Sequence, residues 1–146
     1  MQGDSALGRA LALVRDLRQR WAWKKGKPPL LMAYRLQERA AGVGFDWPDA
    51  KGPIEKVKGG IKEVEWEAGR GRREAIEDEI GDLLFAVVNL ARKLAIDPGA
   101  ALERANDKFK ERFERVEELA AARGVELGRA SLEELDELWE EVKRRD

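Results

Sequence analysis

The sequence predicts an all-α fold built as a helical bundle. Apolar residues recur every three or four positions over long stretches, which places them on one face of a helix. No stretch alternates apolar and polar residues as a half-buried strand does, and Gly and Pro residues separate the helical stretches. With 146 residues, the chain is long enough to bury a sizeable core and fits one domain.

The composition limits the chemistry that this chain can perform. Charged residues make up 39% of the sequence, but the net charge is only -1, so both signs are interspersed over the surface. We therefore expect no dominant polyanion-binding face and no nucleic-acid partner, which leaves a local basic patch as an open alternative. The chain has no Cys and no His, which excludes disulfides, thiolate metal sites and the usual general base. Any catalysis must use Asp, Glu, Lys, Arg or a hard metal ion.

The sequence also lacks the signals of membrane insertion and secretion. No run approaches the roughly 18 apolar residues that a membrane span requires. Residues 1–5 do not form a basic start followed by an apolar core. We expect a cytoplasmic protein without a membrane partner.

The first part of the chain predicts a helix followed by a connector. Asp4 or Ser5 can cap a helix that ends near Arg20. The connector that follows contains Trp21 and Trp23 among Lys, Gly and Pro residues. It is either a cationic loop that faces a nucleotide with stacking indoles, or a linker whose tryptophans pack on the core. The linker is favoured, because aromatic side chains pack more often than they recognise ligands.

The next two helices are expected at residues 30–41 and, with Pro53 in its first turn, over a stretch that runs to about residue 68. Proline suits the first turn of a helix because its missing N–H has no partner there. The loop between the two helices holds Phe45 and Trp47, two large aromatic residues that indicate a pinned loop.

Two adjacent glycines, Gly59 and Gly60, lie inside the helix that has Pro53 in its first turn. Each glycine costs a helix interior about 1 kcal/mol relative to alanine. They indicate either a close backbone approach or kink, or drift at positions where a side chain stopped mattering. The sequence alone leaves these two interpretations open.

The longest apolar pattern predicts a helix over residues 74–94 at the centre of the bundle. Its expected buried face consists of Ile76, Ile80, Leu83, Val87, Leu90 and Leu94. Asp97 and Pro98 then supply an N-cap and a first-turn proline for a helix that runs to about residue 122. Ser131 and Glu134 form a capping box that starts the last helix.

Cations line one face of the helix that follows Pro98, including Lys108 and Arg112. Cations at this spacing can hold phosphate oxygens. Glutamates are interleaved with them, so surface ion pairs are the favoured interpretation of this face.

Acidic residues flank the two central helices. Glu79 and Asp82 are three residues apart, so their oxygens can reach one cation, and Glu63 lies on the corresponding flank of the preceding helix. If the two helices are antiparallel neighbours, the three carboxylates face each other. Oxygen ligands favour Mg²⁺ or Mn²⁺ over Zn²⁺, and such ions suit phosphate substrates. Acidic stripes are also common on helices that bind no metal.

A family resemblance rests on three blocks of sequence: RLQERAAGVGFDW at 35–47, EIGDLLFAVVNLAR at 79–92 and ANDKFKERF at 105–113. In this order they resemble the MazG family of nucleoside triphosphate pyrophosphohydrolases, and in particular its C-terminal catalytic domain. The resemblance covers about residues 30–118. It implies an all-α bundle that forms a homodimer and hydrolyses nucleoside triphosphates with Mg²⁺ to monophosphates and pyrophosphate. We therefore expect a single MazG-like domain over 1–146, with 1–29 as a helix and connector and 124–146 as a C-terminal helix.

The resemblance also implies site residues. The family's metal motif has two consecutive glutamates, two intervening residues and a third glutamate, followed downstream by Glu-x-x-Asp. By position, the third glutamate is Glu63 and the downstream pair is Glu79 and Asp82, so these three are the implied metal ligands and catalytic residues. The family's substrate-binding polar positions fall on Asn89, Lys108 and Arg112.

The chain departs from the family motif at Gly59 and Gly60, where the two consecutive glutamates would stand. Their loss predicts weaker Mg²⁺ binding and removes a group that can position or activate water. Glu67, one turn beyond Glu63, is a candidate substitute, and a partner chain is another source of a ligand. Two functions follow: a Mg²⁺-dependent pyrophosphohydrolase with an altered site, or a catalytically silent module that binds nucleotide or a protein. A plain helical interaction module, whose acids only keep it soluble, is a third.

Overall fold

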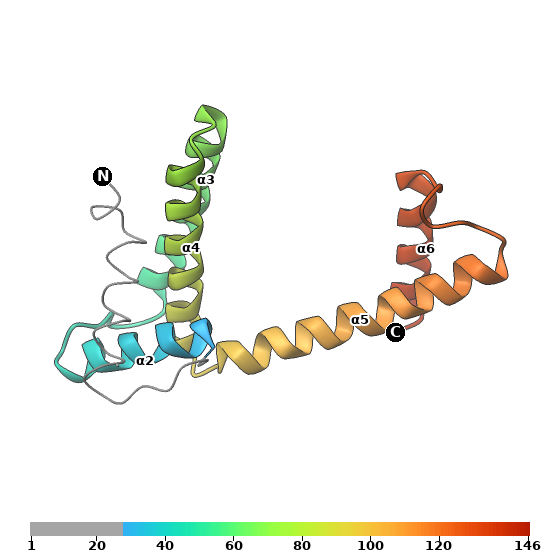
Figure 1. Cartoon of the computed structure of the whole chain (residues 1–146). Coiled ribbons are helices and arrows are strands. Elements are labelled where there is room, and N and C mark those ends of the chain that lie inside the picture. Colours follow the sequence, from blue (N-terminus) through green and yellow to red (C-terminus); the bar gives the residue numbers. More distant parts are fainter. Residues whose placement is uncertain (1–27) are drawn as a thin grey trace. The chain divides into compact units, whose positions relative to one another are not determined.

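The computed structural model describes residues 28–146, and this part of the chain is all-α. Its helices, in order, are α2 (Pro29–Gly42), α3 (Lys51–Arg70), α4 (Arg73–Lys93), α5 (Pro98–Ala122) and α6 (Leu132–Arg144) (Figure 1). No strand occurs within these residues, so the predicted fold class is confirmed. The expected N-terminal helix, and the connector with Trp21 and Trp23, lie outside the described residues. None of the described helices is long and apolar enough to cross a membrane.

Local signals explain where the helices begin and end. Pro29 stands in the first turn of α2, where a missing N–H costs nothing. The third helix begins at Lys51, so Pro53 lies in its first turn as predicted. The Lys51 N–H at the start of α3 donates a 2.9 Å hydrogen bond to the Asp49 carboxylate. The predicted capping box is confirmed, with the Glu134 N–H donating to the Ser131 hydroxyl and the Glu134 carboxylate accepting from the Ser131 N–H.

Helices α3 and α4 form an antiparallel pair that lies side by side (Figure 1). A tight turn joins them, in which Gly71 adopts the left-handed conformation (φ +69°) that glycine accepts without strain. The buried Glu67 carboxylate accepts hydrogen bonds of 2.7 and 2.9 Å from Arg72 Nη2 across this turn. Glu67 therefore forms an ion pair at the end of the hairpin, which argues against its use as a substitute metal ligand.

Helix α2 packs against α4 and is tied to it by a long-range hydrogen bond. The buried Gln37 side chain donates through Nε2 to the Phe85 carbonyl oxygen at 2.9 Å. The predicted buried face of α4 was wrong in part. Val88 is the fully buried residue of α4, whereas Ile80, Val87 and Leu94 are 42%, 44% and 55% exposed. The neighbouring helices α2 and α3 cover a different part of the α4 circumference from the one that the periodicity suggested.

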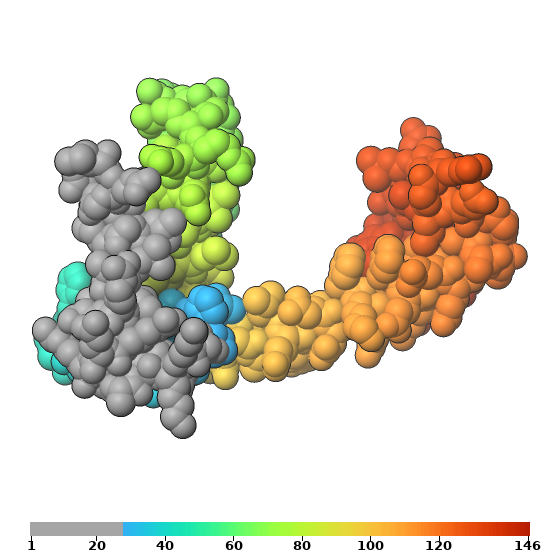
Figure 2. All heavy atoms as spheres, viewed as in Figure 1, coloured from blue at the N-terminus to red at the C-terminus, as the bar shows by residue number. Residues whose placement is uncertain are grey.

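Contacts divide the chain into two compact units, one ending at Gly99 and the other spanning Ala100–Asp146. In the second unit, α6 packs on the later part of α5 (Figure 2) around a core of Val116, Ala120, Leu138 and Val142. On α5, Val116 is buried, whereas Leu102, Phe109 and Phe113 are 49%, 58% and 42% exposed. The expected single domain over 1–146 stays a prediction.

Candidate functional site

A pocket of about 640 Å³ opens between the loop before α3 and the facing sides of α3 and α4. Its wall combines aromatic, acidic and small residues with one lysine and one asparagine. The lining residues are Phe45, Trp47, Gly52, Pro53, Glu55, Lys56, Gly59, Gly60, Glu63, Asp82, Phe85, Ala86 and Asn89. Three of the implied site residues, Glu63, Asp82 and Asn89, therefore line one cavity, together with Gly59 and Gly60.

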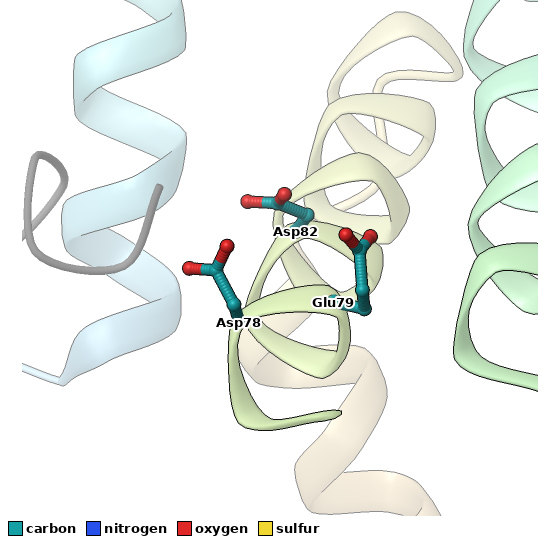
Figure 3. A group of neighbouring side chains, drawn as sticks. All are labelled: Asp78, Glu79 and Asp82. Atoms are coloured by element: carbon teal, nitrogen blue, oxygen red, sulfur yellow. The ribbon is translucent and has the colours of Figure 1, made fainter. Parts of the chain in front are cut away.

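Three carboxylates lie together on α4: Asp78, Glu79 and Asp82 (Figure 3). One oxygen from each lies within 4.8 Å of the others. Helical geometry explains the grouping, since Asp78 and Asp82 are one turn apart and Glu79 is adjacent to the first of them. Asp78 was missed by the sequence interpretation, although its spacing of four residues from Asp82 was a visible signal.

Glu63 of α3 reaches this acidic group through Glu79. The interaction raises the pKa of Glu79 to about 7. The first cause is a side-chain hydrogen bond with Glu63, followed by burial and then by repulsion from the charges of Glu63, Asp82 and Asp78. The antiparallel pairing of α3 and α4 thus brings the three predicted acids, Glu63, Glu79 and Asp82, to one place.

One atom of this cluster is left without a hydrogen bond. Glu79 Oε2 is buried and has no hydrogen-bond partner within residues 28–146. Buried polar atoms are normally satisfied, so an orphaned carboxylate oxygen beside other carboxylates is typical of a place that a cation fills.

The two glycines of α3 face different surroundings. A Cβ added at Gly60 would lie 3.1 Å from Leu83 Cδ1 and 3.7 Å from the Leu83 Cα, so α3 approaches α4 closely at this point. A Cβ added at Gly59 would meet nothing within 4 Å. Close approach therefore accounts for Gly60 but not for Gly59, where the helix backbone borders the pocket and a side chain would fit.

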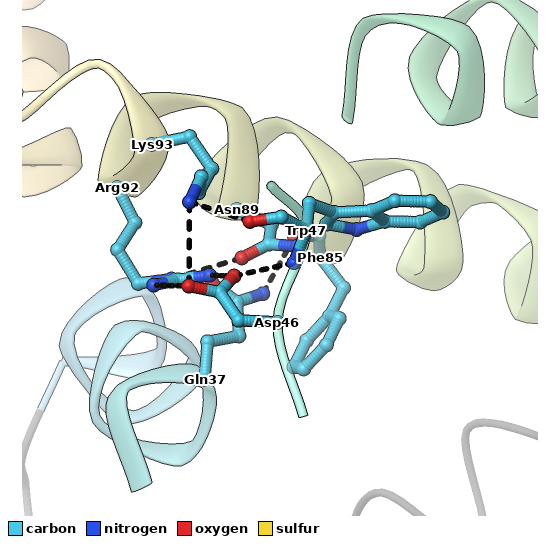
Figure 4. Close-up of polar contacts among 7 residues, drawn as sticks. All are labelled: Gln37, Asp46, Trp47, Phe85, Asn89, Arg92 and Lys93. Atoms are coloured by element: carbon cyan, nitrogen blue, oxygen red, sulfur yellow. Dashed lines mark hydrogen bonds and ion pairs between the residues drawn. The ribbon is translucent and has the colours of Figure 1, made fainter. Parts of the chain in front are cut away.

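A polar clamp holds the loop before α3 against α4 (Figure 4). Asp46 accepts from the Arg92 guanidinium and pairs with Lys93 Nζ at 3.3 Å, and the hydrogen bond from Arg92 is the main cause that lowers the pKa of Asp46 to about 2. Lys93 Nζ also donates to the Trp47 carbonyl oxygen at 2.7 Å. Arg92 Nε donates to Asn89 Oδ1 at 3.0 Å, which orients the Asn89 amide at the pocket wall. The sequence interpretation did not find this clamp.

The remaining predicted residues, Lys108 and Arg112, lie on α5 in the second unit. Arg112 Nε donates to the Asp146 carboxylate at 2.5 Å, and Arg115 pairs with the same carboxylate. Lys108 is exposed. These contacts match the favoured interpretation of surface ion pairs on this face, and a role of Lys108 and Arg112 in substrate binding stays a prediction.

The fold and the pocket define an all-α protein with a carboxylate cluster on a helix pair, whose oxygen-only donors suit a hard divalent cation. Comparison with known proteins then gives the family. The family described as MazG nucleotide pyrophosphohydrolase domain matches residues 54–117. Residues 54–117, which contain most of α3, all of α4 and most of α5, therefore belong to the MazG family, and the resemblance found in the sequence is confirmed.

Individual relatives agree with this assignment. A nucleoside triphosphate pyrophosphohydrolase of Escherichia coli (strain K12) is 45% identical over 121 residues, which cover 82% of this chain and 46% of that protein. The nucleoside triphosphate pyrophosphohydrolase/pyrophosphatase MazG of Thermotoga maritima is 47% identical over 119 residues, with the same two coverages of 82% and 46%. YabN of Bacillus subtilis (strain 168), an uncharacterized protein, is 52% identical over 68 residues, or 47% of this chain and 14% of that protein. The chain thus spans about half the length of the first two relatives.

Proposed function

We propose that this protein is a Mg²⁺-dependent nucleoside triphosphate pyrophosphohydrolase that forms a nucleoside monophosphate and pyrophosphate. The observation that carries the proposal is that Glu63 and Asp82 line one pocket between α3 and α4, with Glu79 interacting with both of them. The names of the two long-matching relatives point to the same reaction. In the pyrophosphohydrolase reaction, water is added across the bond between the α and β phosphates.

The donor set fits a Mg²⁺ ion. Glu63, Glu79 and Asp82 are the proposed ligands, with Asp78 as a further carboxylate beside them. All donors are carboxylate oxygens, and Glu79 Oε2 is buried without a hydrogen-bond partner in the described part of the chain. When bound, such an ion neutralises phosphate oxygens and stabilises the charge that develops in the transition state. Mn²⁺ has the same ligand preference and is the alternative cofactor.

The protein's own residues have separate proposed roles around the substrate. Lys56, which lines the same pocket, presents a cation to a phosphate oxygen. Asn89, oriented by Arg92, presents its amide at the pocket wall. A carboxylate of the cluster that does not hold the ion accepts the proton that the attacking water loses.

The second candidate function is a catalytically silent module that binds a nucleotide or a protein. The observation that favours it is the presence of Gly59 and Gly60 on the pocket wall, where the family motif has two carboxylates. Glu67 does not compensate, because Arg72 and Arg70 engage it at the far end of α3.

One experiment separates the two functions. The purified chain is incubated with each nucleoside triphosphate and Mg²⁺ or Mn²⁺, and the pyrophosphate released is compared with that from Glu79→Gln. Glu77→Gln is the matched control, because Glu77 is an exposed carboxylate on α4 outside the acidic group. Release by wild type and Glu77→Gln but not by Glu79→Gln supports the hydrolase.

The glycine positions supply the complementary variant. If wild type releases nothing and Gly59→Glu combined with Gly60→Glu restores release, the chain is the silent module with a repairable site. Gly59→Glu has open space, whereas Gly60→Glu requires Leu83 to shift by a few tenths of an ångström. If the double variant leaves an already robust activity unchanged, the silent module is the wrong function.

A homodimer in the cytoplasm is the proposed state of the protein. Support for the dimer comes from the α4 residues Ile80, Leu84 and Val87, which share one helix face and are 42%, 54% and 44% exposed. Sedimentation of wild type as a dimer and of Leu84→Asp as a monomer is the expected result. Leu132→Asp is the matched control, because Leu132 is 81% exposed on α6. A monomeric wild type would contradict the proposal.

A further inference from the structure

The pocket has two chemically different regions along α3. Near the start of α3, the pocket wall consists of Phe45 and Trp47, with the Trp47 indole over Gly52. Farther along α3, the wall consists of the acids around Glu63. Gly52 and Glu63 are eleven residues apart on the same helix, which separates the two regions by about 16 Å at 1.5 Å per residue. This distance is sufficient for an extended nucleotide with its base in one region and its phosphates in the other.

Trp47 packs directly on the backbone of α3. A Cβ added at Gly52 would lie 2.2 Å from Trp47 Cε3, 2.5 Å from Cδ2 and 2.8 Å from Cζ3. No side chain fits at this distance, so the glycine is what allows the flat indole to lie against the helix. Trp47 nevertheless stays 39% exposed and lines the pocket, so part of its ring surface is available to a ligand.

The indole is also held in place by the polar clamp. Lys93 binds the Trp47 carbonyl oxygen at 2.7 Å, and the Trp47 N–H donates to Asp46 Oδ1 at 2.7 Å. Figure 4 shows the indole extending away from Asp46 and its two cations. An aromatic ring that is fixed before the ligand arrives loses little conformational freedom on binding, which favours affinity.

We propose that Trp47 is the platform on which the nucleobase of the substrate stacks. The inference rests on the proposed function and adds the place and the mode of base recognition. Stacking uses the π-face that every base possesses, so it tolerates different bases. Purines present a larger face than pyrimidines and are therefore the preferred substrates at this position.

The alternative is that Trp47 only holds the loop in position. Two probes distinguish the roles: α,β-methylene-ATP, which carries a base and cannot be cleaved between its α and β phosphates, and inorganic tripolyphosphate, which has no base. Calorimetry with Mg²⁺ measures the binding of both to wild type, Trp47→Leu and Trp47→Phe. Trp66→Leu is the matched control, because Trp66 is 66% exposed on α3 and does not line the pocket.

Loss of a stacked base weakens binding by about 10- to 100-fold, following the range for base–aromatic stacking. We expect this loss for the ATP analogue in Trp47→Leu, with tripolyphosphate unchanged and with Trp47→Phe close to wild type. If Trp47→Leu weakens the binding of both probes equally, or of neither, Trp47 does not stack on the base, and the proposed function remains intact. Failure of wild type to bind the ATP analogue would instead remove the proposed function and this inference with it.

Discussion

If Glu79 is a Mg²⁺ ligand as proposed, its raised pKa should make the Mg²⁺ affinity depend on pH near neutrality. The side-chain hydrogen bond with Glu63, then burial and then repulsion from the neighbouring acids raise the pKa of Glu79 to about 7. A metal ligand must lose its proton before it binds the ion, so Mg²⁺ and the proton compete for Glu79. This competition can be followed by changing the pH from 6 to 8 in wild type and in Glu79→Gln.

The pKa of Glu79 sets the size of the change in Mg²⁺ affinity. A group with a pKa of about 7 is about one-tenth ionised at pH 6 and about nine-tenths ionised at pH 8, so the apparent Mg²⁺ affinity should rise about tenfold over this interval. At pH 7, each Mg²⁺ that binds should release about half a proton from this group.

Calorimetric titration of Mg²⁺ at pH 6, 7 and 8 measures the affinity, and repetition in buffers of different ionisation enthalpy measures the proton release. Glu79→Gln should bind more weakly and lose the pH dependence, because glutamine does not titrate. Glu77→Gln should behave as wild type. An affinity that is the same at pH 6 and pH 8, or a pH dependence that survives in Glu79→Gln, would show that Glu79 is not the group whose proton competes with Mg²⁺.

Three further predictions test the packing around the site. Gly59→Ala should raise the melting temperature by about 2 to 4 °C, since it gains about 1 kcal/mol of helix propensity in open space, and Gly60→Ala should gain less because its Cβ would lie 3.1 Å from a side chain of α4. Equal gains in calorimetric scans would show that the close approach at Gly60 has no energetic effect. Asp46→Asn should weaken the ion pairs with two cations of α4 and speed amide hydrogen exchange in the loop 43–50, and unchanged exchange would argue against the clamp. Leu138→Ala should cost about 2 to 5 kcal/mol in the unit formed by α5 and α6, measured by denaturant unfolding, because Leu138 is only 4% exposed in that core. A cost below 1 kcal/mol would mean that α6 is not packed as described.

Signals that are local in the sequence predicted the fold well. The proline that begins α5 and the capping box of α6 act through hydrogen bonds within a few residues, so the sequence contains all of their determinants. The same holds for the spacing of Glu79 and Asp82, which share a flank of one helix. Pro53 likewise lies in the first turn of α3, as its missing N–H predicts.

Features that depend on distant partners could not be predicted in the same way. The clamp joins Asp46 to Arg92 and Lys93, which are 46 and 47 residues away, and nothing local indicates this pairing. Periodicity also shows that a helix has an apolar face without showing which neighbour covers it. A large aromatic residue in a loop likewise does not reveal its partner. Phe45 was expected to pin its loop, yet it is 81% exposed, and the loop is held by the clamp and by the packing of Trp47 on Gly52.

The two glycines of α3 show the same limit at the site itself. The sequence left close approach and drift equally open for both glycines. In the structure, the two glycines differ in whether a side chain of α4 lies next to them. Leu83 lies next to Gly60, whereas the space beside Gly59 is open. Only the packing of α4 on α3 contains this information.

The most direct test of the central claim is ³¹P NMR of a nucleoside triphosphate incubated with the protein and Mg²⁺. If the carboxylates of α3 and α4 act together on the phosphate chain, wild type should yield monophosphate and pyrophosphate in equal amounts, and Glu79→Gln should yield neither. The appearance of diphosphate and orthophosphate, or unchanged pyrophosphate formation in Glu79→Gln, would contradict the account.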